Sequence, residues 1–249
     1  AHDFTPCRQP RFPRNSTIGQ IMMIQATQVA PTSNGASTLV DQHYQALARR
    51  LQSASARTGV AESNGGESTH GSVGAIGITS SRRGEGVSTV AANLALAAAE
   101  MSLGPVLLVD ANLPNPDIAS MFQIDPSAGE KGFINALLGE DWHDLVVPTS
   151  VSNLSVMLPG EVGQNRQLLN ERATIRRTIE QLREDFEWVI FDLPPATELS
   201  ECFALSGQLD SVLVVVQADG PSRDVVRKAC RELEIAGANV LGAVLNKHK

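Results

Sequence analysis

No apolar run in this sequence approaches the roughly 18 residues that a membrane-spanning helix needs. The first thirty residues lack a signal-peptide pattern, because the apolar run 21–24 is far too short to form its core. Cysteine is also scarce: Cys7, Cys202 and Cys230 are odd in number and widely spaced, which argues against a disulfide framework and a zinc site. We therefore expect a soluble, cytoplasmic globular protein with reduced thiols.

The sequence is short of positive charge, with 20 Lys and Arg residues against 27 Asp and Glu and a formal net charge of −7. A surface of this sign repels the backbone of nucleic acids, so we expect no nucleic-acid partner. Aromatic residues are few, and Tyr44 is the single tyrosine. The hydrophobic fraction of 42% over 249 residues suits one large α/β domain with an extension.

Composition divides the chain into a flexible extension, an amphipathic helix, a linker and a main domain. The extension is rich in Pro, Gln, Ser, Thr and Asn and has no sustained period. Tyr44, Leu47 and Leu51 recur at helical spacing after a candidate N-cap, Thr38, and this helix could pack on the main domain or contact another subunit. The linker is rich in Gly and Ser. The expected bounds are 1–36, 37–53, 54–73 and 74–249.

From residue 74 onward, apolar runs typical of buried parallel strands alternate with helical patterns. The expected strands are 75–78, 105–110, 154–158, 188–192, 211–216 and 240–245. The expected helices are 90–101, 132–138, 167–186 and 222–236. This alternation predicts an α/β fold: a doubly wound, mostly parallel sheet with helices on both faces.

The stretch 74–94, GAIGITSSRRGEGVSTVAANL in one-letter code, is the most informative part of the sequence. It runs from a strand through a Ser/Arg/Gly loop into an Ala-rich helix. Such a loop leaves backbone N–H groups free at a helix N-terminus, where the dipole also favours an anion, so the expected ligand is a phosphate. The residues expected to bind the cofactor here are Arg82, Arg83, Gly84, Glu85, Gly86, Val87, Ser88 and Thr89.

One residue departs from the phosphate-loop pattern, which ends in Gly-Lys-Ser/Thr. Here Gly86 is followed by Val87, whose apolar side chain cannot neutralise a phosphate. Gly84 and Gly86 still allow the backbone to approach closely, and Ser88 still offers a hydroxyl at the position that usually holds Mg²⁺. The sequence thus predicts the architecture of a nucleotide site with impaired chemistry.

Two carboxylates end predicted strands, Asp110 and Asp192. Parallel strands bring their carboxyl ends to one edge, where open α/β sheets bind ligands, so the two side chains should lie side by side and face the loop Ser80–Ser88. With Ser88, they could hold Mg²⁺ across the β- and γ-phosphates. The alternative for either residue alone is a helix N-cap or a turn former.

These residues carry a family resemblance. ITSSRRGEGVSTVAANLA resembles the phosphate loop of the bacterial tyrosine kinases of capsule and exopolysaccharide synthesis, in which GEGKST and AANLA occur. VLLVDANLPNP is similar to their second motif, an apolar strand followed by Asp-x-Asp-x-Arg-x-Pro, and VIFDLPPA to their third, which ends Asp-x-Pro-Pro. GFINALLGE, NLSVMLPG and GANVLGAVLN resemble further segments, so the match covers 74–246 nearly end to end.

The resemblance implies a fold of the P-loop NTPase class, with ATP or ADP and Mg²⁺ as cofactors where the site still functions. It implies a membrane-bound polysaccharide co-polymerase or export protein as partner, and a place at the inner face of the membrane through that partner or an upstream domain. Carried over by motif, it implies catalytic roles for Asp110, Asp192 and Asn112, metal ligation by Ser88, Asp110 and Asp192, and nucleotide contact by Asn246.

Several positions depart from the family pattern. Val87 replaces the loop lysine, Asn112 replaces the second carboxylate of Asp-x-Asp, and Asn115 stands where a basic residue is usual. The family's ring-assembly motif, Glu-x-x-Arg-x-x-Arg, aligns with Gln42, Gln45 and Ala48, so we expect a monomer or a homodimer rather than a ring. The sequence also ends three residues past Asn246, without the family's tyrosine cluster.

We therefore expect a kinase-like, catalytically impaired regulator or scaffold of exopolysaccharide or capsule biosynthesis and export. One alternative is an active tyrosine autokinase or ATPase of the same pathway, in which an arginine replaces the lysine and Tyr44 accepts phosphate. The other is a positioning ATPase like the related partition and cell-division ATPases, whose signature lysine would align with Arg82. Val87 and the closer match of Asp-x-Pro-Pro and the terminal VLN to the kinase family argue against the positioning ATPase, whereas Mg²⁺-dependent ATP turnover or phosphate on Tyr44 would distinguish the autokinase.

Overall fold

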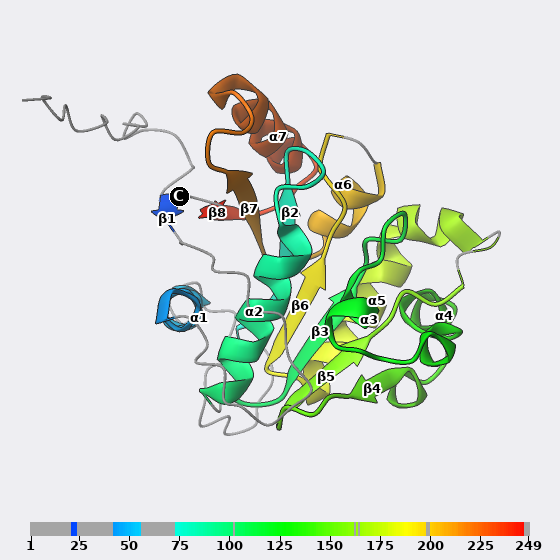
Figure 1. Cartoon of the computed structure of the whole chain (residues 1–249). Helices are drawn as coiled ribbons and strands as arrows, with labels where there is room; N and C mark the ends of the chain where they lie inside the picture. Colours follow the sequence, from blue (N-terminus) through cyan, green and yellow to red (C-terminus); the bar gives the residue numbers. More distant parts are fainter. Residues whose placement is uncertain are drawn as a thin grey trace, which may run out of the picture.

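The structure, a computed structural model, describes residues 21–23, 42–55, 73–101, 103–161, 163, 165–197 and 200–246. In this part of the chain, eight strands form one sheet in the order β1-β8-β7-β2-β6-β3-β5-β4. Every neighbouring pair is parallel except β4 and β5. The expected doubly wound, mostly parallel sheet is confirmed (Figure 1).

The strands are β1 Ile21–Met23, β2 Gly74–Ser80, β3 Val106–Asp110, β4 Val146–Pro148, β5 Leu154–Met157, β6 Trp188–Asp192, β7 Ser211–Gln217 and β8 Val240–Asn246. The α-helices are α1 Gln42–Ser55, α2 Val87–Glu100, α3 Ile118–Met121, α4 Phe133–Leu137, α5 Arg172–Asp185, α6 Ser200–Ser206 and α7 Arg223–Ile235. Short 3₁₀ helices span Pro126–Gly129, Trp142–Asp144 and Asn165–Asn170.

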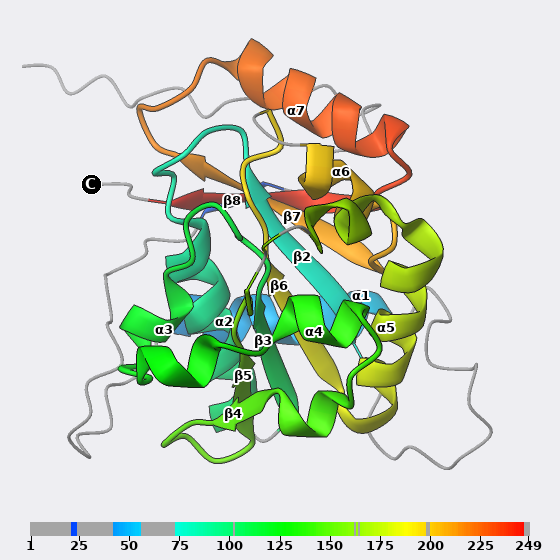
Figure 2. The ribbon, with the colours of Figure 1, turned by 90° about the vertical axis from the view of Figure 1, so that its right-hand side faces the viewer.

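Two apolar cores lie on opposite faces of the sheet. One packs α1 and α2 against the sheet, with Ile76 and Ile78 of β2 facing it. The other packs α4, α5, α6 and α7 against the opposite face, which Ala75 of the same strand faces. Because successive side chains of a strand point to opposite faces, a strand covered on both sides is a continuous apolar run. Figure 2, turned by 90°, shows α4 and α5 in front of the strands and α7 along the top.

The helix expected at 167–186 begins later than the sequence suggested. Residues Asn165–Asn170 form a 3₁₀ helix, and α5 starts at Arg172. Glu171, with φ −86° and ψ 85°, has a non-helical backbone and separates the 3₁₀ helix from α5. Leu169 is buried in the same core as α5, which explains why its apolar pattern resembled a continuation of the helix.

The N-terminal part of the chain is described only in pieces. Helix α1 spans Gln42–Ser55, and the expected helix 37–53 begins outside the described residues, as does its expected N-cap Thr38. Most of the expected extension and linker also lies outside them. Within the extension, however, Ile21–Met23 form β1, an unpredicted strand that pairs with Ala243–Leu245 of β8. None of the helices in the described part of the chain combines the length and apolar character that crossing a bilayer requires.

Candidate nucleotide-binding site

The phosphate loop, Ser80–Ser88, joins the end of β2 to the start of α2 at the carboxyl edge of the sheet. Gly84 and Gly86 have φ values of 80° and 90°, in the left-handed region that favours glycine. Gly86 is the N-cap of α2 and gives the helix no side-chain hydrogen bond. The first backbone N–H groups of α2, together with the helix dipole, make this end of the helix electrostatically favourable for an anion.

A cavity of about 420 Å³ opens over this loop. Its walls are the loop, the segment after β3 and the segment after β6: Ser80, Arg83, Gly84, Gly86, Val87, Ser88, Thr89, Asn112, Asn115, Pro116, Asp117, Leu193 and Pro195. No lysine of the described residues lines it. Its cationic wall residue is Arg83, and Val87 lines it at the place where the phosphate-loop pattern has lysine.

Three residues expected to bind the cofactor are not among those that line this cavity: Arg82, Glu85 and Asn246. Glu85 is 2% exposed, and its carboxylate is turned into the protein. There it accepts hydrogen bonds from Ser81 Oγ at 2.9 Å, the Arg82 N–H at 2.7 Å and the Gln217 N–H at 3.2 Å. Asn246 is also buried, and its Nδ2 donates to the Glu85 carbonyl at 2.8 Å.

Asp110 and Asp192 are directly paired across β3 and β6, and both are fully buried at the carboxyl edge. Asp110 is used as a helix cap. Its Oδ2 accepts from the N–H groups of Asp117 and Ile118, both at 3.1 Å, at the start of α3, and its Oδ1 accepts from the Asn112 N–H at 3.3 Å. Burial raises its pKa to about 6, although these backbone hydrogen bonds lower it.

Asp192 is the contrasting member of the pair. Neither of its carboxylate oxygens has a hydrogen-bond partner among the described residues. Burial raises the pKa of Asp192 well above its ordinary value, and the charge of Asp110 raises it further. The Ser88 hydroxyl lies near enough to lower this pKa but not in hydrogen-bond geometry. A buried carboxylate without partners needs either a proton or a cation.

The unpaired oxygens provide a test of whether the site fits Mg²⁺. Asp192 Oδ1 and Oδ2 and Asn112 Oδ1 are buried without partners in the described part of the chain. Asn112 and Ser88 line the cavity, whereas Asp110 and Asp192 lie behind its wall. Oxygen atoms of this kind are the ligands that Mg²⁺ prefers. Asp110 fits less well, because both of its oxygens already accept from backbone amides. No group of three or more His, Cys, Asp or Glu side chains that could hold a metal occurs in the described ranges.

The segment after β6 contributes residues that sequence reasoning did not assign to the site. Leu193 and Pro195 line the cavity, and Asn115, Pro116 and Asp117 line its other side. The Ala196 N–H donates to the Ser80 carbonyl at 2.8 Å, and the Thr197 hydroxyl donates to the Ser81 carbonyl. These residues could have been found from their position in the sequence, because they directly follow β6, which ends at the carboxyl edge of the sheet.

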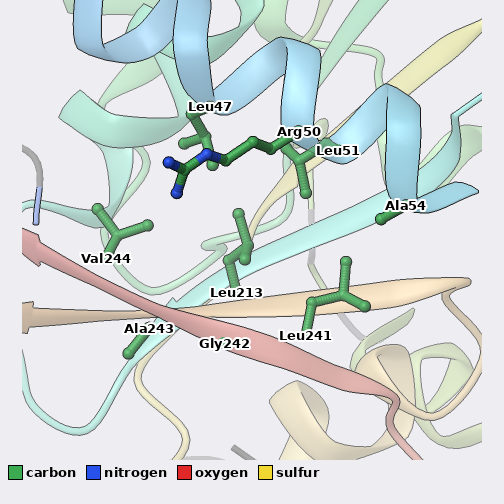
Figure 3. Close-up of a pocket in the computed structure, with 9 residues that line it drawn as sticks. All are labelled: Leu47, Arg50, Leu51, Ala54, Leu213, Leu241, Gly242, Ala243 and Val244. Carbon is green, nitrogen blue, oxygen red and sulfur yellow. The ribbon is translucent and has the colours of Figure 1, made fainter. Parts of the chain in front are cut away.

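Helix α1 lies away from this site, and a smaller cavity of about 110 Å³ separates it from β7 and β8 (Figure 3). Leu47 and Leu51 of α1 face Leu213 and Val244 across it. Tyr44, the single tyrosine, is 1% exposed within the core. Ala48, one of the positions aligned with the ring-assembly motif, is also fully buried, so it packs on this domain.

Comparisons with known proteins agree with the fold. The family model described as cellulose biosynthesis protein BcsQ matches residues 73–235. Tyrosine-protein kinase CpsD of Streptococcus agalactiae serotype III (strain NEM316) is 33% identical over 173 residues, which cover 69% of this chain and 73% of that protein. Succinoglycan biosynthesis transport protein ExoP of Rhizobium meliloti is 28% identical over 176 residues, 69% of this chain but 22% of that longer protein.

Solved structures show the same fold at low sequence identity. The chimerical protein CapA2B2 superposes with a TM-score of 0.73 at 24% identity, covering 91% of this chain and 92% of that one. The kinase domain of the Escherichia coli tyrosine kinase ETK gives 0.66 at 22%, with coverages of 89% and 84%. MinD of Pyrococcus horikoshii with Mg-ADP gives 0.58 at 22%, with 70% of each chain covered. With the identity to CpsD, these likenesses show that the chain belongs to the bacterial tyrosine kinase family of P-loop ATPases.

Proposed function

We propose that this protein is a kinase-like regulator or scaffold of exopolysaccharide or capsule biosynthesis and export, with an ATP site that binds nucleotide weakly and transfers phosphate poorly or not at all. The pathway is inferred from relatives named as a tyrosine-protein kinase and a succinoglycan biosynthesis transport protein. The impairment is inferred from the site of this chain.

The observation that carries the proposal is Val87 on the cavity wall. A charge-assisted hydrogen bond contributes roughly 1.5–3 kcal/mol, so loss of the lysine weakens nucleotide binding by about 10- to 150-fold. Phosphoryl transfer is more sensitive, because stabilising charge on the migrating group is worth about 10³–10⁵ in rate where an arginine finger supplies it. Binding can therefore persist where catalysis does not.

In this proposal the nucleotide phosphates lie on the free N–H groups at the start of α2. Ser88 and Asp192 would hold Mg²⁺, which would neutralise charge on the β- and γ-phosphates. Asp110 would act indirectly, because its oxygens fix the start of α3 and the segment that carries Asn112 and Asp117. Asn112 offers an amide oxygen where a second carboxylate would activate an acceptor hydroxyl.

We further propose that the partner is a membrane-bound polysaccharide co-polymerase or export protein. That contact would place this protein at the cytoplasmic face of the membrane. ExoP supports this arrangement, because the matching segment is 22% of a longer protein named for transport. The protein would then act through a contact that responds to the state of its phosphate loop.

The second candidate function is an active autokinase or ATPase, which is favoured by Arg83. This guanidinium lines the cavity and could supply positive charge to a phosphate. Tyr44 disfavours autophosphorylation of the chain itself, because its side chain is 1% exposed and cannot reach the phosphate loop from α1 without unfolding. ATP hydrolysis is not subject to that objection.

Calorimetry with ATP and ADP, with and without Mg²⁺, tests the proposal on the full chain. We expect weak binding that Mg²⁺ strengthens, and no phosphotyrosine or ATP turnover above the protein-free rate. Steady Mg²⁺-dependent turnover would establish the autokinase or ATPase alternative. Absence of binding to either nucleotide at millimolar concentration would reject the nucleotide site and leave the scaffold role to be tested with the partner.

A further inference from the structure

Glu85 lies inside the phosphate loop but is turned away from the cavity. It is 2% exposed, and its carboxylate receives three hydrogen bonds from three different places. Oε2 accepts from Ser81 Oγ and from the Arg82 N–H, both at the first turn of the loop, and Oε1 accepts from the Gln217 N–H at the end of β7. Three donors suit a carboxylate, which is rich in acceptor sites.

The backbone carbonyl of Glu85 is held as well, by a hydrogen bond from a residue of β8. Asn246, the last residue of β8, donates its Nδ2 to the Glu85 carbonyl at 2.8 Å. Asn246 also pairs with Gln217 in the register of β7 and β8, and its carbonyl accepts from the Ala218 N–H at 2.8 Å. The loop is therefore tied to the ends of two strands that contribute no residue to the cavity wall.

We infer that Glu85 is a positioning residue, which holds the phosphate loop in its ligand-ready conformation before any nucleotide binds. This deepens the function proposed above for the same site. A loop with two glycines at positive φ would otherwise sample many conformations, and ordering it on binding would weaken affinity. Preorganisation by Glu85 lowers that cost, which matters most in a loop without its lysine.

The inference also explains why Asn246, which was expected to contact the nucleotide, does not line the cavity. Its amide acts through Glu85, so Asn246 supports the loop from behind while the N–H groups of Gly86 to Ser88 remain available to a ligand. Because Gln217 and Asn246 lie side by side at the strand ends, a displacement there would pass directly to the loop. Gln217 and Asn246 thus both hold the phosphate loop through Glu85.

The test measures the loop itself in the unliganded full-length chain. Hydrogen–deuterium exchange of residues 81–88 is compared in wild type, Glu85→Ala and Glu85→Gln, with Glu184→Ala on the exposed face of α5 as matched control. We expect Glu85→Ala to speed loop exchange by about tenfold or more, since three hydrogen bonds are lost. Glu85→Gln retains an acceptor oxygen and should be intermediate, and Glu184→Ala should match wild type.

Exchange of β2 and β6 separates a positioning role from general destabilisation. If exchange of β2 and β6 stays at the wild-type level while exchange of the loop rises, the effect of Glu85→Ala is local. Unchanged exchange of the loop in Glu85→Ala would overturn the inference. Should Glu85→Ala raise exchange throughout the sheet, Glu85→Gln decides instead: selective loop opening supports the role, and uniform opening rejects it. None of these readouts requires a nucleotide, so failure of ADP binding would count against the proposed function alone.

ADP affinity supplies the functional readout in the Val87→Lys background, where the missing charge is restored. We expect Glu85→Ala to lower ADP affinity about tenfold there and to leave adenosine affinity unchanged, because the loop contacts phosphate. Equal losses for ADP and adenosine would point to general damage and overturn the positioning role.

Discussion

Asp110 and Asp192 face each other across β3 and β6, but only the Asp110 side chain of the two has hydrogen-bond partners among the described residues. Asp110 closes the N-terminus of α3, whereas both oxygens of Asp192 are buried and unpaired in the described structure. The Asp110 carboxylate therefore has a structural role, which is to hold the start of α3. The Asp192 carboxylate is buried at a cost in desolvation free energy, which a bound proton or cation would lower.

The first prediction concerns the pH dependence of stability. Burial raises the pKa of Asp192 above its ordinary value of 3.8, so the folded state holds this proton more tightly than the unfolded chain does. Its contribution to the free energy of unfolding is fully present below about pH 4 and is lost as the pH rises through the raised pKa. Asp192→Asn should remove this loss, so urea unfolding from pH 4 to 8 should show a flatter profile than wild type.

Asp110→Asn provides the matched control for that experiment. The pKa of Asp110 is also raised, to about 6, so Asp110 likewise contributes stability that is lost as the pH rises through about 6, and Asp110→Asn should also flatten the profile. The substitution replaces one acceptor oxygen of the carboxylate, which should lower the free energy of unfolding by about 1–3 kcal/mol because the Asp117 and Ile118 N–H groups lose acceptor capacity. Asp192→Asn removes no side-chain hydrogen bond of the described structure, so it should leave the protein more stable at neutral pH than Asp110→Asn does. A loss of stability in Asp192→Asn at pH 8 would show that the ionised carboxylate is favourable in the fold.

The second prediction is that Val87→Lys raises affinity for ATP and ADP by about one to two decades, because a lysine here adds the charge that the loop lacks. Calorimetry measures this change, and Val87→Met is the uncharged control of similar length. Phosphotyrosine should not appear, since transfer also needs a base and an acceptor held in line. Unchanged affinity would mean that the loop does not receive phosphate.

The third prediction distinguishes two adjacent arginines. Arg83 lines the cavity and Arg82 does not, although both side chains are exposed. Arg83→Ala should weaken ADP binding by about two- to fivefold, the range for a solvent-screened charge, while Arg82→Ala should have a smaller effect. A larger loss in Arg82→Ala would favour the signature-lysine role expected for that position by alignment.

The fourth prediction compares two glycines with different constraints. At Gly132, whose backbone is extended, an added Cβ would lie 1.9 Å from the Leu158 carbonyl oxygen, so Gly132→Ala should cost about 3 kcal/mol through forced rearrangement. At Gly84 the space is open but φ is 80°, so Gly84→Ala should cost roughly 1–2 kcal/mol. Denaturant midpoints give both values, and the reverse order would contradict the geometry.

The fifth prediction concerns assembly. Gln42 and Gln45 lack the charges of the family's ring-assembly motif, and Ala48 is buried against the domain. We therefore expect light scattering to give a monomer or a dimer over the micromolar range. A stable octamer formed without a partner would refute this expectation.

The sequence predicted the sheet and the meeting of Asp110 and Asp192 at its carboxyl edge, because both depend on local patterns. Buried parallel strands are continuous apolar runs, and Asp110 and Asp192 end two of them. The direction of Glu85 was not predictable in this way, because its partners Gln217 and Asn246 are far along the chain and meet it only when β7 and β8 form. The capping role of Asp110 was one of two open alternatives, and only the tertiary placement of α3 decided it.

Strand β2, which leads into the phosphate loop, pairs with β6 on one side and β7 on the other in the middle of the sheet. Substitutions that disturb its end would therefore damage folding, whether or not a nucleotide is bound. The folded loop therefore depends on Gly84, Glu85 and Gly86 through two positive φ values and the hydrogen bonds of Glu85, whether or not the site binds nucleotide. Val87 is 9% exposed and packs in the core on one face of the sheet, so its side chain serves the fold at the place where the phosphate-loop pattern has lysine.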